Sequence, residues 1–290
     1  MNPKEAYEYA LKNGPDENTR KIACEDPEYA YLYGVEIDKS FHEDIDNVLL
    51  NTEYGEKYIK FLMDQSEKIY EYALKNGPDE QTRNIICRDI YYAYKYALNI
   101  DKGPRADTRE AACKKSYLAS WYALDIDKCP REDTRKAACK NPEDAYEYAR
   151  YVDKGPHEDT RKAACKYLLS AYDYAVSVDR RPRKDTRKAA CKDSYTACWY
   201  AKNVDMCPRN DTRKISCQNP ECAYYYAKDV DKGPREDTRN AACENPEFAY
   251  LYAKDVDKGF HENTYKALLD TEYEEKYDEF LNSKMKEEII

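Results

Sequence analysis

The sequence predicts an all-α chain, an α-solenoid of helical hairpins that forms a curved superhelix with capping helices. Three observations predict it: a fixed repeat, two helix starts in each repeat, and chain ends that depart from the repeat in matching ways. The pattern Thr-Arg-x-x-x-Cys occurs eight times, seven of them at a spacing of 26 residues. A fixed period of this length is typical of a stacked array. Its Thr positions are Thr82, Thr108, Thr134, Thr160, Thr186, Thr212 and Thr238, with an offset copy at Thr19.

Each repeat predicts two short helices, as residues 127–152 illustrate. Pro130 and the acidic residues after it predict the first turn of one helix, with Pro near its first position. Asn141 and Pro142 predict the start of a second helix. From Ala145 onwards, apolar residues recur at the i, i+3, i+4 and i+7 positions of one helical face. Asp-Lys-Gly follows in sibling copies, and we expect its Gly to end the helix. The unit is a hairpin of about ten plus eleven residues.

Two repeat positions never vary among the copies: one is always Ala and the other is always Tyr. We expect the alanines to lie where helices pack closely, and the tyrosines to form a layer of half-buried rings whose hydroxyls stay near water. The chain has 31 Tyr against 5 Phe, which fits that use of tyrosine. The alanines are Ala30, Ala93, Ala119, Ala145, Ala171, Ala197, Ala223 and Ala249. The tyrosines, called here the invariant tyrosines, are Tyr33, Tyr96, Tyr122, Tyr148, Tyr174, Tyr200, Tyr226 and Tyr252.

The residue just before each invariant tyrosine varies widely between acidic, basic, aromatic and aliphatic types. A repeat position that tolerates all of these faces outward, so we interpret it as the candidate contact surface. This position is called here the outward column, and its candidate binding residues are Lys95, Trp121, Glu147, Asp173, Trp199 and Tyr225, with Leu32 and Leu251 in the end copies.

The period breaks near the N-terminus in an ordered way. The half-repeat that begins at Glu5 returns at Lys68, and the segment that begins at Phe41 returns at Phe260. We therefore predict a short N-terminal array (residues 1–64) and a main array (residues 65–290) with a C-terminal cap at 257–290. We expect Phe41-His42 and Phe260-His261 to pack inside the caps, because the last repeat of a stack needs its core covered. A break in the stack near residues 62–68 is predicted, and a continuous superhelix with an irregular layer there is the alternative.

The cysteines and histidines predict no catalytic or metal chemistry. Eight of the 12 Cys occupy one repeat position, where neighbours are expected about 9–10 Å apart, too far for a disulfide. The chain has no Cys-x-x-Cys pair and only 3 His, so no metal spacing emerges. We expect small buried thiols, a reducing cytoplasm, no cofactor, no enzyme activity and a soluble chain without a membrane-spanning run.

Charge is uneven along the chain, whose formal net charge is −9. Residues 1–64 hold 7 basic against 15 acidic residues and residues 257–290 hold 5 against 10, whereas residues 65–256 hold 36 against 32. Two arginine columns cross this centre. One follows each repeat Thr, as at Arg109, and we expect it to pair with acids of adjoining repeats. The second is the candidate anion-binding column: Arg105, Arg131, Arg183, Arg209 and Arg235.

The repeats also resemble a known group of proteins. Pro-Glu-x-Ala-Tyr-x-Tyr-Ala, as at 246–253, and Asp-Lys-Gly-Pro-Arg-Glu-Asp-Thr-Arg, as at 231–239, are similar to tandem short αα (HEAT-like) repeats of unknown function in large bacteriophages and giant DNA viruses. The resemblance covers nearly the whole chain and carries no catalytic residues. It implies a viral accessory protein in the host cytoplasm that engages a host protein such as a defence factor.

Together these observations favour a non-enzymatic binding protein that presents a solenoid surface to a protein partner. Nucleic-acid binding through residues 101–230 is an alternative, as is mimicry of nucleic acid by the acidic ends. An enzyme, or a pocket for a small nucleotide between the two arrays, are further alternatives. The identity of the partner and the oligomeric state stay open.

Overall fold

The computed structural model describes residues 1–39, 42–49 and 52–288. Over these residues the chain is helical and contains no strand, which confirms the all-α prediction. The chain forms two compact units, Met1–Ala137 and Ala138–Ile290. None of the described helices is long and apolar enough to cross a membrane.

The first unit is a series of helices, short except for α5, in which consecutive elements pack on one another. Second helices of successive repeats also pack side by side, as α7 does against α9. The elements are α1 (Pro3–Asn13), α2 (Glu17–Ala23), α3 (Pro27–Leu32), α4 (Glu43–Leu49), α5 (Gly55–Asn76), α6 (Glu80–Ile86), α7 (Ile90–Tyr96), α8 (Ala106–Ala112), α9 (Ser116–Trp121) and most of α10 (Glu132–Ala138).

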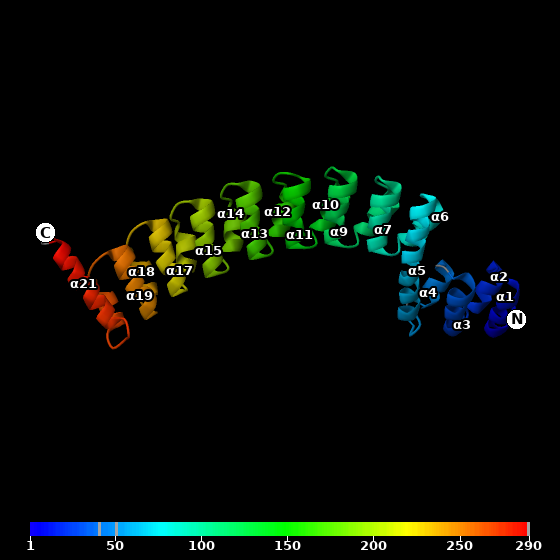
Figure 1. The fold of residues 1–290 in the computed structure, drawn as a ribbon, viewed down its shortest axis with the longest axis horizontal. Coiled ribbons are helices and arrows are strands. Elements are labelled where there is room, and N and C mark those ends of the chain that lie inside the picture. Colours follow the sequence, from blue (N-terminus) through cyan, green and yellow to red (C-terminus); the bar gives the residue numbers. More distant parts are fainter. Residues whose placement is uncertain (40–41, 50–51, 289–290) are drawn as a thin grey trace. The chain divides into compact units, whose positions relative to one another are not determined.

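The second unit repeats the same helix pair. Its second helices α11, α13, α15, α17 and α19 lie next to one another in chain order (Figure 1). Its elements are α11 (Pro142–Glu147), α12 (Glu158–Ala164), α13 (Leu168–Tyr174), α14 (Lys184–Ala190), α15 (Ser194–Tyr200), α16 (Asn210–Ser216), α17 (Pro220–Tyr225), α18 (Glu236–Ala242), α19 (Pro246–Tyr252), α20 (Glu262–Leu268) and α21 (Glu274–Glu288).

The first helix of each repeat is shorter than predicted and begins later. It spans 7 residues in α12, against the ten expected, and the N-cap is His157 rather than a residue before the proline. Pro156 therefore precedes the cap instead of opening the helix. The second helix begins as predicted: Pro142 is its first residue, and the Asn141 side chain accepts hydrogen bonds from the Glu143 and Asp144 N–H groups.

Each second helix ends in a π-helical turn, which the sequence did not predict. In these turns a carbonyl accepts from the N–H five residues on, as when the Met206 N–H donates to the Ala201 carbonyl at 2.9 Å. The π-helical turns are η1 (Tyr33–Asp38), η2 (Ala97–Asp101), η3 (Tyr122–Asp127), η4 (Tyr148–Val152), η5 (Ala175–Asp179), η6 (Ala201–Asp205), η7 (Tyr226–Asp231) and η8 (Ala253–Asp257).

The residue that turns the chain out of the helix is not the predicted glycine. Lys232 has a φ of 55° and Met206 a φ of 52°, in the left-handed region, whereas Gly233 does not have a positive φ. The expectation that Gly closes the helix was wrong by one residue. A cation at this position interacts favourably with the negative end of the helix dipole, which offsets part of the strain of a left-handed side chain. The other such residues are Lys39, Lys102, Lys128, Lys154, Arg180 and Lys258.

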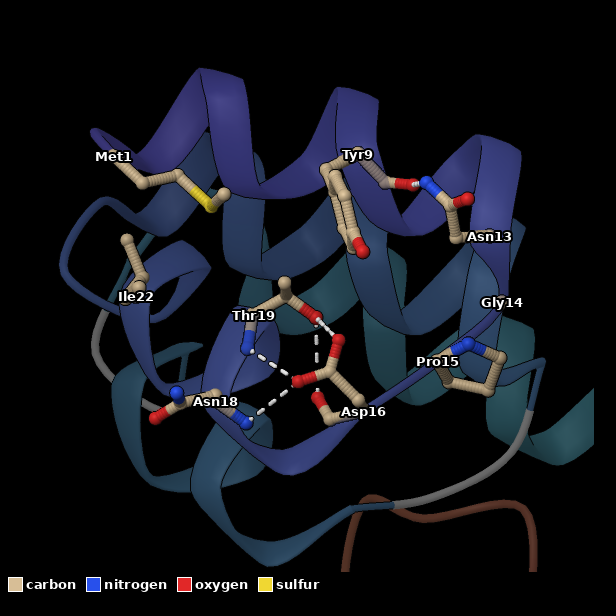
Figure 2. A pocket seen from close by; sticks show the side chains of 9 residues that line it. All are labelled: Met1, Tyr9, Asn13, Gly14, Pro15, Asp16, Asn18, Thr19 and Ile22. Atoms are coloured by element: carbon tan, nitrogen blue, oxygen red, sulfur yellow. Dashed lines mark hydrogen bonds between the residues drawn. The ribbon is translucent and has the colours of Figure 1, made fainter.

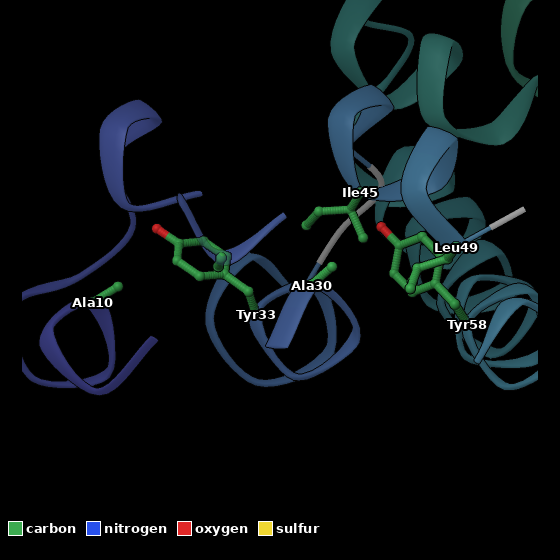
Figure 3. Close-up of a cluster of buried hydrophobic side chains, with 7 residues drawn as sticks. Ala10, Ala30, Tyr33, Ile45, Leu49 and Tyr58 are labelled. Atoms are coloured by element: carbon green, nitrogen blue, oxygen red, sulfur yellow. The ribbon is translucent and has the colours of Figure 1, made fainter. Parts of the chain in front are cut away.

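The cap segments replace the repeat core with apolar side chains. Ala10, Tyr33, Ile45, Leu49 and Tyr58 are buried in one cluster of the first unit (Figure 3). At the other cap Tyr277 is buried, as predicted for a covered end, but Phe260 is 62% exposed and so does not pack inside the cap. Phe41 and Leu50 lie outside the described residues.

Helix α5 runs from Gly55 to Asn76, so residues 62–68, where a break was predicted, lie inside one continuous helix.

Candidate binding surface on the second helices

The invariant tyrosines form the frame from which the outward column projects. All eight are 0% exposed, so the expectation of half-buried rings with wet hydroxyls was wrong. The hydroxyl of Tyr200 accepts from the Arg183 N–H at 3.1 Å, donates to the Arg183 carbonyl at 3.2 Å, and lies 2.8 Å from the Thr186 Oγ1. The backbone of the N-cap residue is thus held by a tyrosine, also in first helices such as those capped by Arg183, Arg209 and Arg235, where the N-cap side chain forms no capping hydrogen bond.

The same contact recurs along the chain and explains why Thr and Tyr never vary. Thr–Tyr hydroxyl distances of 2.8 to 3.0 Å are found for Thr19–Tyr33, Thr82–Tyr96, Thr108–Tyr122, Thr160–Tyr174, Thr212–Tyr226 and Thr238–Tyr252. In the caps, Tyr58 and Tyr277 take this place: the His42 and His261 N–H groups donate to their hydroxyls at 3.3 and 3.1 Å. A buried backbone N–H without such a partner would cost about 1–3 kcal/mol.

The arginine that follows each repeat Thr is part of the frame as well. Arg187 donates to both carboxylate oxygens of Asp205, with its Nη2 2.6 Å from Oδ1. The predicted ion pairing is confirmed, but the main partner is the Asp that ends the second helix rather than the acid next to Thr-Arg. The corresponding pairs are Arg20–Asp38, Arg83–Asp101, Arg109–Asp127, Arg161–Asp179, Arg213–Asp231 and Arg239–Asp257.

The outward column lies on the exposed side of the second helices, one residue before each buried tyrosine. Trp121 is 42% exposed, Trp199 46% and Tyr225 43%, although each is a large aromatic side chain next to a fully buried tyrosine. Lys95, Glu147 and Asp173 are half-buried at the same repeat position. Burial, followed by the like charges of Asp144 and Glu143, raises the pKa of the Glu147 carboxyl.

Both tryptophans are held by tyrosines in the same way. The Trp121 ring lies 5.2 Å from Tyr117, one turn earlier on α9, and 6.1 Å from Tyr94 on the preceding second helix. The Trp199 ring lies 6.4 Å from Tyr195 on α15 and 6.2 Å from Tyr172 on α13. Packing against two rings fixes the orientation of each indole without burying it.

Hydrogen bonds between neighbouring repeats hold these tyrosines in turn. The Tyr94 hydroxyl donates to Asp125 at 2.7 Å, and burial together with this bond raises the pKa of Tyr94 above its ordinary value. The Asn203 amide donates to the Tyr172 hydroxyl at 2.8 Å, and the Tyr195 hydroxyl donates to Glu221 at 2.8 Å. The aromatic groups around the outward column are therefore ordered before any partner binds.

Lys95 occupies the outward column in a different way. Its Nζ lies 4.5 Å from the ring centroid of Tyr91 and 5.3 Å from that of Tyr92, which places the ammonium over two aromatic faces. This copy thus presents a cation on an aromatic support where Trp121 and Trp199 present an indole.

The candidate anion-binding arginines lie elsewhere, at the start of the first helices. Arg105, Arg183, Arg209 and Arg235 are N-cap residues. The Nε of Arg209 is 3.3 Å from Asp205, that of Arg183 is 3.7 Å from Asp179, and that of Arg235 is 3.6 Å from Asp237. Arg131 lies 3.5 Å from Asp133. Nearby carboxylates thus offset part of the positive charge of four members of this column.

The cysteines are free thiols, and those of the repeat position are half-buried rather than fully buried. Burial raises the pKa of Cys191 to about 11 and that of Cys217 to about 12, which keeps these thiols protonated and unreactive near neutral pH. Among the described residues no three His, Cys, Asp or Glu side chains are placed to hold a metal ion.

A cavity of about 650 Å³ lies next to the N-terminus and is lined by residues of the first two helices and their connection, among them Tyr9 and Asp16. Its carboxylate, Asp16, accepts from the Asn18 and Thr19 N–H groups and from the Thr19 hydroxyl (Figure 2). These are helix-capping bonds, so this carboxylate is already engaged by the fold.

Sequence reasoning missed the tyrosines that hold the tryptophans. A signal was present, since the position two residues before the invariant tyrosine is also Tyr in six of the eight copies: Tyr31, Tyr94, Tyr146, Tyr172, Tyr224 and Tyr250.

No protein-family model, curated protein or solved structure matches the chain. The resemblance to viral repeat proteins therefore stays a prediction.

Proposed function

We propose that the chain is an α-solenoid binding protein without enzyme activity, and that it holds a protein partner on the outward column of its second helices. The observation that carries this proposal is the pair of tryptophans at one repeat position, each packed by two tyrosines and still more than 40% exposed. Ordered, half-exposed aromatic side chains are the residues that contribute most to protein–protein affinity.

The frame supports this use because it makes the surface rigid. Each outward residue is directly followed by a fully buried tyrosine whose hydroxyl is bonded to the neighbouring helix. Little conformational entropy remains for these side chains to lose when a partner binds. The variety of side chains at the outward position then provides specificity without disturbing the fold.

The charges around the tryptophans favour a protein over a nucleic acid. The tyrosines that hold the indoles donate to Asp125 and Glu221, which places carboxylates beside the aromatic surface. Phosphate groups would be repelled there, whereas nucleic-acid sites need clustered cations. The resemblance to viral repeat proteins makes a host protein in the cytoplasm the expected partner, and free thiols fit such a reducing compartment.

Site-specific photocrosslinking tests the proposal. A photoreactive phenylalanine analogue replaces Trp121, Trp199 or Tyr225 one at a time, and control proteins carry it at Lys162 or Lys188, which are exposed on first helices. In extracts of the cells that make the protein, we expect the three outward positions to label one and the same protein and the controls to leave it unlabelled. Equal labelling from both sets of positions, or labelling of RNA in place of protein, would contradict the proposal.

A further inference from the structure

A groove between two neighbouring repeats of the second unit has a charge pattern unlike that of the surface just described. It lies at the ends of the π-helical turns η4 and η5 and has a volume of about 660 Å³. Its lining includes Arg150, Lys154 and Arg180 but no acidic residue. It is called here the basic groove.

The three cations are not neutralised by the protein. None of them forms an ion pair with a residue that the structure describes. The Arg150 Nη1 donates to the Tyr146 hydroxyl at 2.6 Å, and the Arg180 Nε donates to the Ser177 carbonyl at 3.4 Å. Both are neutral acceptors. Asp173 acts electrostatically on Arg150 but does not line the groove.

The other repeats show that a partner is missing here. Lys202 and Lys228 occupy the same repeat position as Arg150, and each forms an ion pair at 2.7 Å, with Asp229 and Asp255 of the following repeat. The residue that corresponds to these aspartates beside Arg150 is Ser177. The groove beside Arg150 thus lacks the counter-charge that Lys202 and Lys228 have, while Arg180 keeps the cation that is Lys at this repeat position in most other copies.

The electrostatics of the groove suit a phosphate. The C-terminal ends of η4 and η5 lie at the groove, and each contributes about half a negative charge. Three side-chain cations exceed this and leave about two positive charges, which matches the −1.5 to −2 of a phosphate monoester. Tyr151 also lines the groove and is 46% exposed, with the Arg150 guanidinium 5.1 Å from its ring centroid. An aromatic face next to a cation suits a planar base.

We propose that the basic groove binds a nucleotide, with its phosphates on Arg150, Lys154 and Arg180 and its base against Tyr151. The volume falls in the range of sites that hold one small ligand. No residue of the outward column lines this groove, and Asp173 acts on it only electrostatically, through Arg150. It would make the protein a nucleotide-responsive or nucleotide-sequestering binder.

Calorimetric titration of the full chain at low salt tests this site, with ADP, adenosine and inorganic phosphate as probes. We expect ADP to bind at least about tenfold more tightly than either fragment, and Arg150→Ala or Arg180→Ala to weaken ADP binding by about tenfold or more. Tyr151→Ala should weaken ADP but leave inorganic phosphate unchanged. Lys228→Ala, which removes a paired cation at the same repeat position, is the matched control and should leave ADP affinity within about twofold.

Three results would overturn the nucleotide site. One is the absence of ADP binding at millimolar concentration. Another is equal affinity in Arg150→Ala and the wild type, since the groove would then not hold the phosphates. The third is affinity for single-stranded oligonucleotides that exceeds that for ADP and rises steadily with length, because that behaviour belongs to a nucleic-acid track rather than to a one-nucleotide groove. Circular dichroism of each variant verifies that these exposed substitutions leave the fold intact.

Discussion

The tyrosine hydroxyl at the centre of each repeat contacts a threonine and both backbone groups of an N-cap residue, and this explains the composition of the chain. Phe in place of Tyr200 would leave the Arg183 N–H without its buried acceptor, and the Thr186 hydroxyl would keep only its 3.3 Å bond to the Arg183 carbonyl. The N-cap residue can then be Arg, which has no acceptor to cap a helix, because the tyrosine supplies the bonds. The large excess of Tyr over Phe therefore reflects buried hydrogen bonds and not, as the composition first indicated, wet ring edges.

The buried aspartates that pair with the frame arginines are not equivalent, and this gives a prediction. Asp205 is bonded through both oxygens to Arg187, whereas Asp179 lies 3.5 Å from Arg161 and its second oxygen has no hydrogen-bond partner. Arg161 instead has Asp185 at 3.0 Å. We expect Asp205→Asn to lower the free energy of unfolding by about 3 kcal/mol at pH 7. Asp179→Asn should cost far less or stabilise, because it removes a poorly compensated charge. Urea unfolding measures both.

The dependence of this effect on pH follows from the pKa of Asp179. Burial raises that pKa above the ordinary value of an aspartate. A raised folded-state pKa means that this group stabilises the protein below its unfolded-state pKa and that the contribution is lost as pH rises through the folded-state value. The advantage of Asp179→Asn over the wild type should therefore be largest at pH 7 and shrink as the pH falls below the folded-state pKa. An advantage that grew at low pH would show that the carboxylate is well compensated after all.

Helix ends are the elements that sequence patterns described least well. The Asn-Pro start of the second helices was predicted because the cap is local: the Asn141 side chain reaches N–H groups two and three residues on. The start of the first helix and the π-helical turns were not predicted. They depend on contacts such as the Arg183–Tyr200 hydrogen bond and the Arg187–Asp205 ion pair, whose partners are 17 and 18 residues apart in the sequence. No local pattern contains both partners of such contacts.

The residue with a positive φ at the end of each second helix leads to a prediction about the stability of that helix end. Met206 is 80% exposed, has a φ of 52° and brings no charge to the helix end. Met206→Gly should raise the free energy of unfolding by roughly 1 kcal/mol, since Gly adopts this conformation without strain. Lys232→Gly should gain less, because it also removes a favourable cation from the helix terminus. Thermal unfolding compares the two, and destabilisation by Met206→Gly would show that the turn carries no strain.

At the scale of the whole chain, comparison of the repeats predicted the helical repeats and the outward column but not the basic groove. Copies that agree located the buried alanines and tyrosines, and copies that disagree located Trp121 and Trp199 on the outward face. The basic groove was not found, because it depends on Arg150 and Arg180 from two neighbouring copies meeting in space and on an acid being absent at Ser177. Comparing the copies at one repeat position at a time does not show which side chains of neighbouring repeats meet.

Neighbouring positions in each second helix have different roles: the invariant tyrosine stabilises the fold, and the residue before it is available to contact a partner. Equilibrium unfolding of Trp199→Leu and Tyr200→Phe tests this claim most directly, because Leu32 and Leu251 show that the frame accepts leucine at the outward position. We predict a loss of about 2 kcal/mol for Tyr200→Phe and of less than about 1 kcal/mol for Trp199→Leu. An equal or larger loss for Trp199→Leu would contradict the claim, since the tryptophan would then belong to the frame.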